Sequence, residues 1–122
     1  MQSAILEHTL SAAERRIVAE FARRVRARFG DRMARVVLFG SRARGDVTEE
    51  SDIDLLVLLR VPVAEETQAT REVWEIVEDV LRLAPKVYVP LAPIVLAEEG
   101  FLELKRLERA FALDVEAEGI PL

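Results

Sequence analysis

Apolar residues along the first quarter of the chain recur at helical spacing. The pattern begins after Ser11-Ala12-Ala13-Glu14, which has the form of a capping box. It ends at Gly30, a natural stop for a helix. We therefore predict a helix over about 12–29. Its apolar stripe consists of Ile17, Val18, Phe21, Val25 and Phe29.

The spacing then changes to that of strands. A short β-branched apolar run predicts a strand over about 34–39, followed by a short helix at 41–44. A second apolar run predicts a buried strand over about 53–60, and Pro62 ends it. The two apolar runs, Val36-Val37-Leu38-Phe39 and Leu55-Leu56-Val57-Leu58-Leu59, indicate buried strands.

The second half of the chain repeats the change of spacing. A helical pattern over about 64–83 precedes an irregular third strand over about 86–96. Pro90 and Pro93 in that strand cannot donate ladder hydrogen bonds, so we expect an edge strand or a bulge. A helical C-terminal region begins at Glu98. This order predicts an α/β (α+β) fold with a three-stranded mixed sheet and helices packed on it.

Length and composition indicate a small globular protein. With 122 residues, of which 51% are hydrophobic, we expect one globular domain over 1–122. The chain has no cysteine, which excludes disulfides and thiolate metal sites. The first residues lack the pattern of a signal peptide, and no apolar run approaches the roughly 20 residues that span a bilayer. We therefore expect a soluble cytoplasmic protein with no membrane partner.

The net charge of −5 conceals an asymmetry. Residues 1–44 hold ten arginines and four acids, whereas the remainder is strongly acidic. The arginines of the first helix fit either a surface for RNA or an acidic partner, or a solvated helix face. We favour the solvated face because no aromatic residues interleave with these arginines as a base-stacking surface requires. Nucleic acid is not the expected partner.

The first candidate for chemistry is the turn Gly40-Ser41-Arg42-Ala43-Arg44 at the end of the first strand. Gly40 permits close approach of a phosphate to the backbone. Ser41 is a good N-cap for the helix that follows, whose N-terminal N–H groups favour an anion. Arg42 and Arg44 add positive charge. An ordinary capped strand-to-helix turn is the alternative for this motif taken alone.

The second candidate is the pair Asp52 and Asp54 at the start of the second strand. Because side chains alternate along a strand, both carboxylates face one side, roughly 6–7 Å apart. Hard cations such as Mg²⁺ bind to oxygen ligands of this kind. A solvated strand entrance is the alternative for the pair alone. The neighbouring Gly40-Ser41 turn favours the metal interpretation.

The motif Gly-Ser-Arg-Ala-Arg-Gly-Asp, four residues, then Ser-Asp-Ile-Asp-Leu-Leu-Val resembles the signature of the DNA polymerase β-type nucleotidyltransferase superfamily. Within it, the chain resembles the minimal nucleotidyltransferases (MNT). The resemblance implies that Gly40, Ser41, Arg42 and Arg44 bind the phosphates of ATP or another nucleoside triphosphate. It also implies that Asp52 and Asp54 are catalytic and hold Mg²⁺, with two ions expected. The family commonly pairs with a helical HEPN-domain protein in toxin–antitoxin systems.

One feature departs from the family pattern. Active members normally carry a third carboxylate on a later strand, but residues 86–96 contain no acid. The chain offers four other acids as substitutes, namely Asp46, Asp79, Glu98 and Glu99.

Two hypotheses about function follow. The protein transfers AMP from ATP to a hydroxyl of a HEPN partner, as an antitoxin, or it is a non-catalytic subunit that binds and neutralises that partner. We favour the enzyme. With no acceptor domain, we expect a partner protein, a homo-oligomer, or both.

Overall fold

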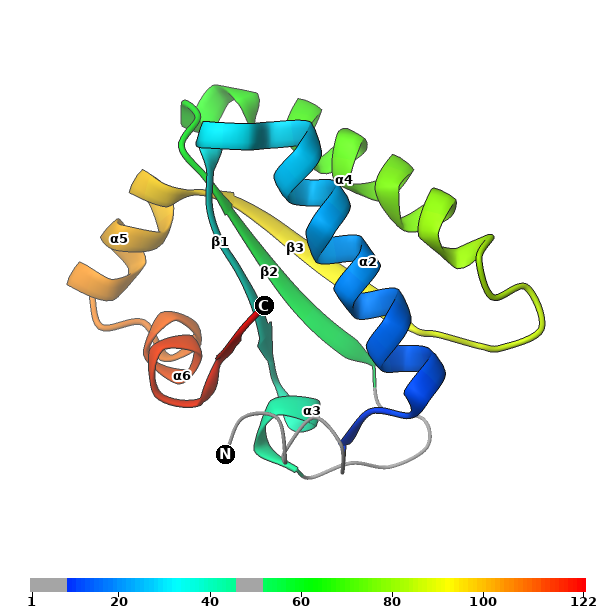
Figure 1. Ribbon diagram of the computed structural model, residues 1–122. Coiled ribbons are helices and arrows are strands. Elements are labelled where there is room, and N and C mark those ends of the chain that lie inside the picture. Colours follow the sequence, from blue (N-terminus) through cyan, green and yellow to red (C-terminus); the bar gives the residue numbers. More distant parts are fainter. Residues whose placement is uncertain (1–8, 46–51) are drawn as a thin grey trace.

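The computed structural model describes residues 9–45 and 52–122, which form a mixed sheet between two layers of helices (Figure 1). The strands are β1 (Met33–Phe39), β2 (Ile53–Leu59), β3 (Leu91–Ala97) and β4 (Ile120–Pro121). Their order is β3-β2-β1-β4. β1 is antiparallel to β2 and β4, whereas β2 and β3 are parallel. The predicted α/β fold is confirmed, and the two-residue β4 makes the sheet four-stranded rather than three-stranded.

Helices cover both faces of this sheet. α2 (Ala12–Phe29) and α4 (Glu66–Leu81) lie side by side on one face, and α5 (Glu98–Arg106) and α6 (Ala110–Glu118) lie on the other (Figure 1). The four-residue α3 (Ser41–Arg44) follows β1 directly. Two 3₁₀ turns, η1 (Gly30–Arg32) and η2 (Val63–Glu65), complete the elements. None of the helices in the described ranges is long and apolar enough to cross a membrane.

The first helix forms as its sequence predicts. The Glu14 backbone N–H donates to Ser11 Oγ at 3.1 Å, and the Ser11 backbone N–H donates to Glu14 Oε1 at 2.8 Å. This reciprocal capping box satisfies two donors that a helix start otherwise leaves unpaired. The predicted apolar stripe, from Ile17 to Phe29, is buried against the sheet. The capping box and the stripe together fix both the start and the orientation of α2.

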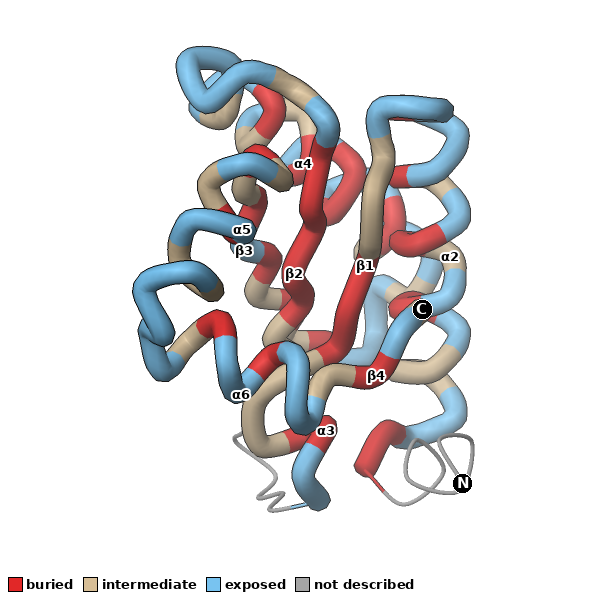
Figure 2. Tube along the Cα trace, turned by 90° about the vertical axis from the view of Figure 1, so that its left-hand side faces the viewer, coloured by how far each residue is buried: buried red, intermediate tan, exposed pale blue. Residues whose placement is uncertain are grey.

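Alternation along β2 divides the core between the two faces of the sheet. Ile53, Leu55, Val57 and Leu59 pack with α2 and α4, whereas Leu56 and Leu58 pack with α5 and α6. β2 is accordingly buried along most of its length, whereas β1 is buried over residues 36–38 (Figure 2). Because side chains alternate, Asp54 projects on the face that α5 and α6 cover.

Two predicted boundaries differ from the structure. The third strand begins at Leu91 rather than near residue 86, because Pro90 offers no N–H to a ladder. The Pro90 carbonyl instead accepts a hydrogen bond from the Ile53 backbone N–H at 2.9 Å. β3 is an edge strand, as the prolines predicted. The C-terminal helical region is two helices, separated where Glu108 adopts a φ of 53°.

Candidate functional site

Gly40 and Asp54 lie in direct contact where β1 ends and β2 begins. Phe39 pairs with Asp54 across the two antiparallel strands, so the next residue, Gly40, turns beside that carboxylate. Gly40 has a φ of 75°, a conformation that favours glycine. A β-carbon built on it would lie 2.3 Å from Asp54 Oδ2. The absence of a side chain therefore makes room for the Asp54 carboxylate against the turn.

The charge of Asp52 acts on the carboxyl group of Asp54. The pKa of Asp54 is raised by partial burial first and by the charge of Asp52 second, while Arg44 opposes both. Asp52 is exposed and Asp54 is half-buried. A cation bound between these two carboxylates, at the start of β2, would relieve the repulsion between them.

The two arginines of the motif lie in different environments. Arg44 is exposed, contacts Glu118 at 3.5 Å and is near enough to Asp54 to lower its pKa. Arg42 is only 4% exposed, and its guanidinium donates to the Thr9 carbonyl at 2.8 Å and to Glu14 Oε1 at 3.1 Å. Arg42 therefore ties α3 to the start of α2, whereas Arg44 is the motif arginine whose charge acts on Asp54.

Ser41 also has a different local role from the one predicted. Gly40 is the N-cap of α3, Ser41 is the first helical residue, and no side chain caps this helix. The backbone N–H groups of Ala43 and Arg44 donate to the Gly40 carbonyl at 3.1 and 3.2 Å. With four residues, α3 carries little helix dipole. Phosphate binding at this turn would depend on the bare Gly40 backbone, Ser41 and the charge of Arg44.

The expected third carboxylate is missing from the strand beside Asp54. Ala92 of β3 pairs with Asp54 of β2, and Ile94 pairs with Leu56 on the same face. Among the described residues no group of three or more acids, histidines or cysteines could hold a metal ion. Two carboxylates nevertheless fit one Mg²⁺, which commonly keeps several waters and takes its remaining ligands from substrate phosphates. Of the four proposed substitutes, Asp79 lies on α4, Glu98 and Glu99 lie on α5, and Asp46 falls outside the described residues.

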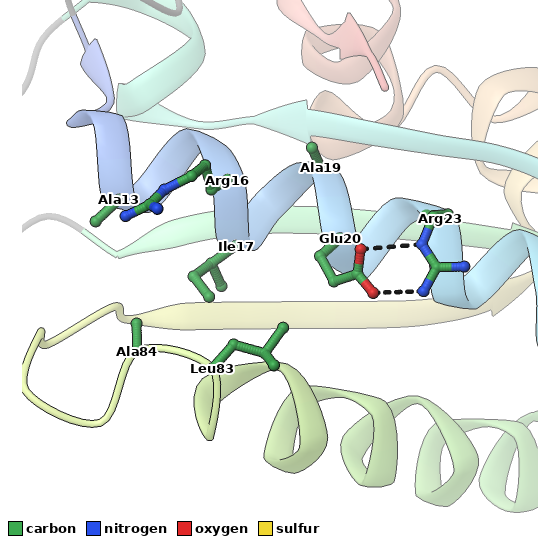
Figure 3. A pocket seen from close by; sticks show the side chains of 8 residues that line it. All are labelled: Ala13, Arg16, Ile17, Ala19, Glu20, Arg23, Leu83 and Ala84. Atoms are coloured by element: carbon green, nitrogen blue, oxygen red, sulfur yellow. Dashed lines mark hydrogen bonds and ion pairs between the residues drawn. The ribbon is translucent and has the colours of Figure 1, made fainter.

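A separate hollow of about 480 Å³ lies between α2 and the end of α4 (Figure 3). Arg16 and Ile17 line it from α2, and Leu83 and Ala84 line it from the segment after α4. It lies on the opposite face of the sheet from Asp54, where Ile17 joins the core beneath α2 and α4. The hollow is therefore not part of the Gly40–Asp54 site.

Sequence reasoning found the motif residues but not the side chains that hold them. Glu14 pairs with Arg42 and Glu118 pairs with Arg44, from positions 28 and 74 residues away in the chain. The capping box predicts Glu14 at a helix start, but no local signal predicts its second role. Likewise, only the register between β2 and β3 identifies Ala92 as the neighbour of Asp54.

The nucleotidyltransferase domain family matches residues 18–111, which include both halves of the motif. The chain therefore belongs to this family, and it is an enzyme of the nucleotidyl-transferring class. The resemblance that the motif carries is confirmed at this level.

Relatives support the same assignment. A Methanocaldococcus jannaschii protein named "Putative protein adenylyltransferase MJ0141" is 32% identical over 104 residues, covering 85% of this chain and 93% of the relative. A second protein of that organism, "Putative protein adenylyltransferase MJ0604", is 44% identical over 45 residues, or 37% of this chain and 45% of the relative. A crystal structure of "a putative nucleotidyltransferase from Sulfolobus solfataricus" shares the fold. The TM-score is 0.53 and the identity 21%, over 96% of this chain and 84% of that one.

Proposed function

We propose that this nucleotidyltransferase transfers AMP from ATP to a hydroxyl group of a partner protein. The observation that carries the proposal is the contact between Gly40 and Asp54, which puts a bare turn of backbone beside a carboxylate pair. The names of the relatives favour adenylylation of protein. We further propose that the partner is a HEPN-domain protein and that the modification silences it, as in an antitoxin. This step rests on the family resemblance alone.

Each residue of the site has a role in this proposal. Asp52 and Asp54 would hold Mg²⁺, which when bound neutralises phosphate charge and makes an attacking hydroxyl more acidic. The Gly40 backbone and Ser41 would approach the β- and γ-phosphates, and Arg44 would contribute positive charge there. Arg42, bound to Thr9 and Glu14, holds the turn from inside the protein. A second Mg²⁺ would require a carboxylate from the partner or from elsewhere in the chain.

The second candidate function is a nucleotidyltransferase-fold subunit that binds and neutralises its partner without transfer. The observation that favours it is Ala92, which lies beside Asp54 where a third carboxylate would complete a two-metal site. The intact Gly40–Ser41 turn and Asp52–Asp54 pair favour the enzyme. A homo-oligomer would offer a second source of the missing acid.

Intact-mass spectrometry tests the two candidates. The purified chain is incubated with ATP, Mg²⁺ and the product of the neighbouring gene, beside an Asp52→Asn/Asp54→Asn variant that preserves shape and removes charge. A gain of one or more AMP units on the partner, absent with the variant, supports transfer. A stable complex without any mass gain, although the chain binds ATP, supports the non-catalytic subunit.

A further inference from the structure

The order of the strands places three segments in a row at the site. Phe39 of β1 pairs with Asp54 of β2, and Asp54 pairs in turn with Ala92 of β3. Neighbouring strands are about 4.8 Å apart, so β1 and β3 flank the carboxylate pair on opposite sides. The Gly40 turn lies on the β1 side. The β3 side is the edge of the sheet within the described residues.

This arrangement determines the side from which the acceptor reaches the site, an inference that rests on the proposed function. In nucleotidyl transfer the acceptor oxygen forms a bond to the α-phosphorus while the bond from that phosphorus to the pyrophosphate oxygen breaks. Pyrophosphate leaves with the electron pair, and the hydroxyl proton passes to water. The attacking and leaving oxygens lie roughly in line. If the Gly40 turn holds the leaving phosphates on the β1 side, the acceptor must approach from the β3 side.

The β3 side presents exposed apolar side chains. Ile94 shares the face of Asp54 by alternation and is 41% exposed. Tyr88, which is 80% exposed, lies in the segment leading into β3. That segment is held at the site because the Pro90 carbonyl accepts the hydrogen bond from Ile53, the residue between the two aspartates. Figure 1 shows it returning from α4 to the end of the sheet where β2 begins.

The chemistry of this surface selects a class of acceptor. Between Pro85 and Ala97 the only charged residue is Lys86, and every other side chain except that of Tyr88 is apolar. A polar small molecule, such as a sugar, needs several hydrogen-bonding side chains to select one of its hydroxyls. A protein segment with apolar residues beside its hydroxyl needs an apolar contact surface, and tyrosine is enriched in such interfaces.

We propose that Tyr88 and Ile94 form the docking surface for the protein acceptor, and that this surface selects hydroxyls flanked by apolar residues. The site therefore has two sides. Nucleotide binds towards β1 and acceptor docks on β3.

Two synthetic peptides test this inference. Each carries one tyrosine and one serine, flanked by leucines in one peptide and by glycines in the other. Transfer of AMP is measured with α-phosphate-labelled ATP and Mg²⁺, and ATP affinity is measured separately by calorimetry. We compare the wild-type chain with Tyr88→Ser, Ile94→Ser and the control Val63→Ser, which is 50% exposed in its native form and follows the opposite end of β2.

We expect the wild-type chain and Val63→Ser to prefer the leucine peptide in kcat/KM by about tenfold or more. Tyr88→Ser and Ile94→Ser should lose this preference while ATP affinity stays unchanged. Variants with weakened ATP affinity and an unchanged preference would assign the surface to the nucleotide instead. A wild-type chain that labels both peptides equally, or that labels neither although it transfers AMP to the partner protein, would overturn the docking surface. A wild-type chain that binds ATP but transfers AMP to no acceptor would contradict the proposed transfer and support the non-catalytic subunit. A wild-type chain that does not bind ATP would contradict the proposed function itself.

Discussion

Gly40, which follows β1, and Asp54 of β2 meet so closely that a β-carbon on Gly40 would lie 2.3 Å from Asp54 Oδ2. The atom that it meets is the end of a side chain, which can rotate away. A methyl group at this position would therefore displace the carboxylate rather than prevent folding. The contact links the phosphate half of the motif to the metal half.

We predict that Gly40→Ala abolishes nucleotidyl transfer at a moderate cost in stability. The positive φ should cost about 1–3 kcal/mol in the free energy of unfolding. Gly30→Ala is the matched control, since Gly30 also has a positive φ but meets nothing within 4 Å. Denaturant unfolding and transfer activity are measured for both. If Gly40→Ala keeps full activity, the position of the Asp54 carboxylate is not important for transfer.

The two motif arginines should respond in opposite ways to substitution by methionine. Arg42→Met removes a buried cation from the Thr9 carbonyl and Glu14, so we expect a loss of about 1–3 kcal/mol in the free energy of unfolding. Arg44→Met removes an exposed side chain and should change unfolding by less than about 1 kcal/mol. It should instead weaken ATP binding by about tenfold or more. Equal effects on stability would show that the two environments do not differ in this way.

Ala92 offers a test of the missing carboxylate. Ala92→Asp places an acid on β3 opposite Asp54, so we expect tighter binding of Mg²⁺ and faster transfer. Without the cation, the added charge should lower the melting temperature, because it faces a carboxylate pair that already repels itself. Ala92→Asn is the control with the same shape and no charge. A gain in activity shared by both variants would rule out the charge as its cause.

Glu14 should give the folding stability a defined pH dependence. Although burial raises its pKa, the Ser11 backbone N–H and Arg42 together lower it below the ordinary 4.5. A carboxyl group whose folded pKa is lowered stabilises the protein above its unfolded pKa and loses that contribution as the pH falls through the folded pKa. Glu14→Gln should therefore unfold more easily than wild type at pH 7.

Below pH 4.5 the difference in the free energy of unfolding between Glu14→Gln and wild type should become smaller. Denaturant unfolding at several pH values measures it. The surface pair Arg82–Asp79 supplies a control, because Asp79→Asn removes an exposed partner and should change stability little at either pH. A difference for Glu14→Gln that is the same at pH 7 and pH 3 would contradict the assignment.

The elements that could be predicted correctly from the sequence are those that depend on local interactions. The capping box fixed the start of α2, the continuous apolar runs predicted two buried strands, and the prolines predicted an edge strand. The sequence also singled out Gly40, Ser41, Asp52 and Asp54, because a glycine turn after one apolar run and an Asp-x-Asp pair at the start of the next are local patterns. Their roles in binding phosphate and metal stay predictions. These features involve spacings that the chain itself imposes.

Contacts between segments distant in the chain determine which motif residues share an environment. Arg42 and Arg44 are two residues apart, and no local pattern distinguishes the arginine that is buried against Thr9 and Glu14 from the one near Asp54. The register of β3 is also non-local, since Ala92 becomes the neighbour of Asp54 only when the edge strand pairs with β2. Such contacts depend on packing between segments far apart in the chain, which local spacing does not encode.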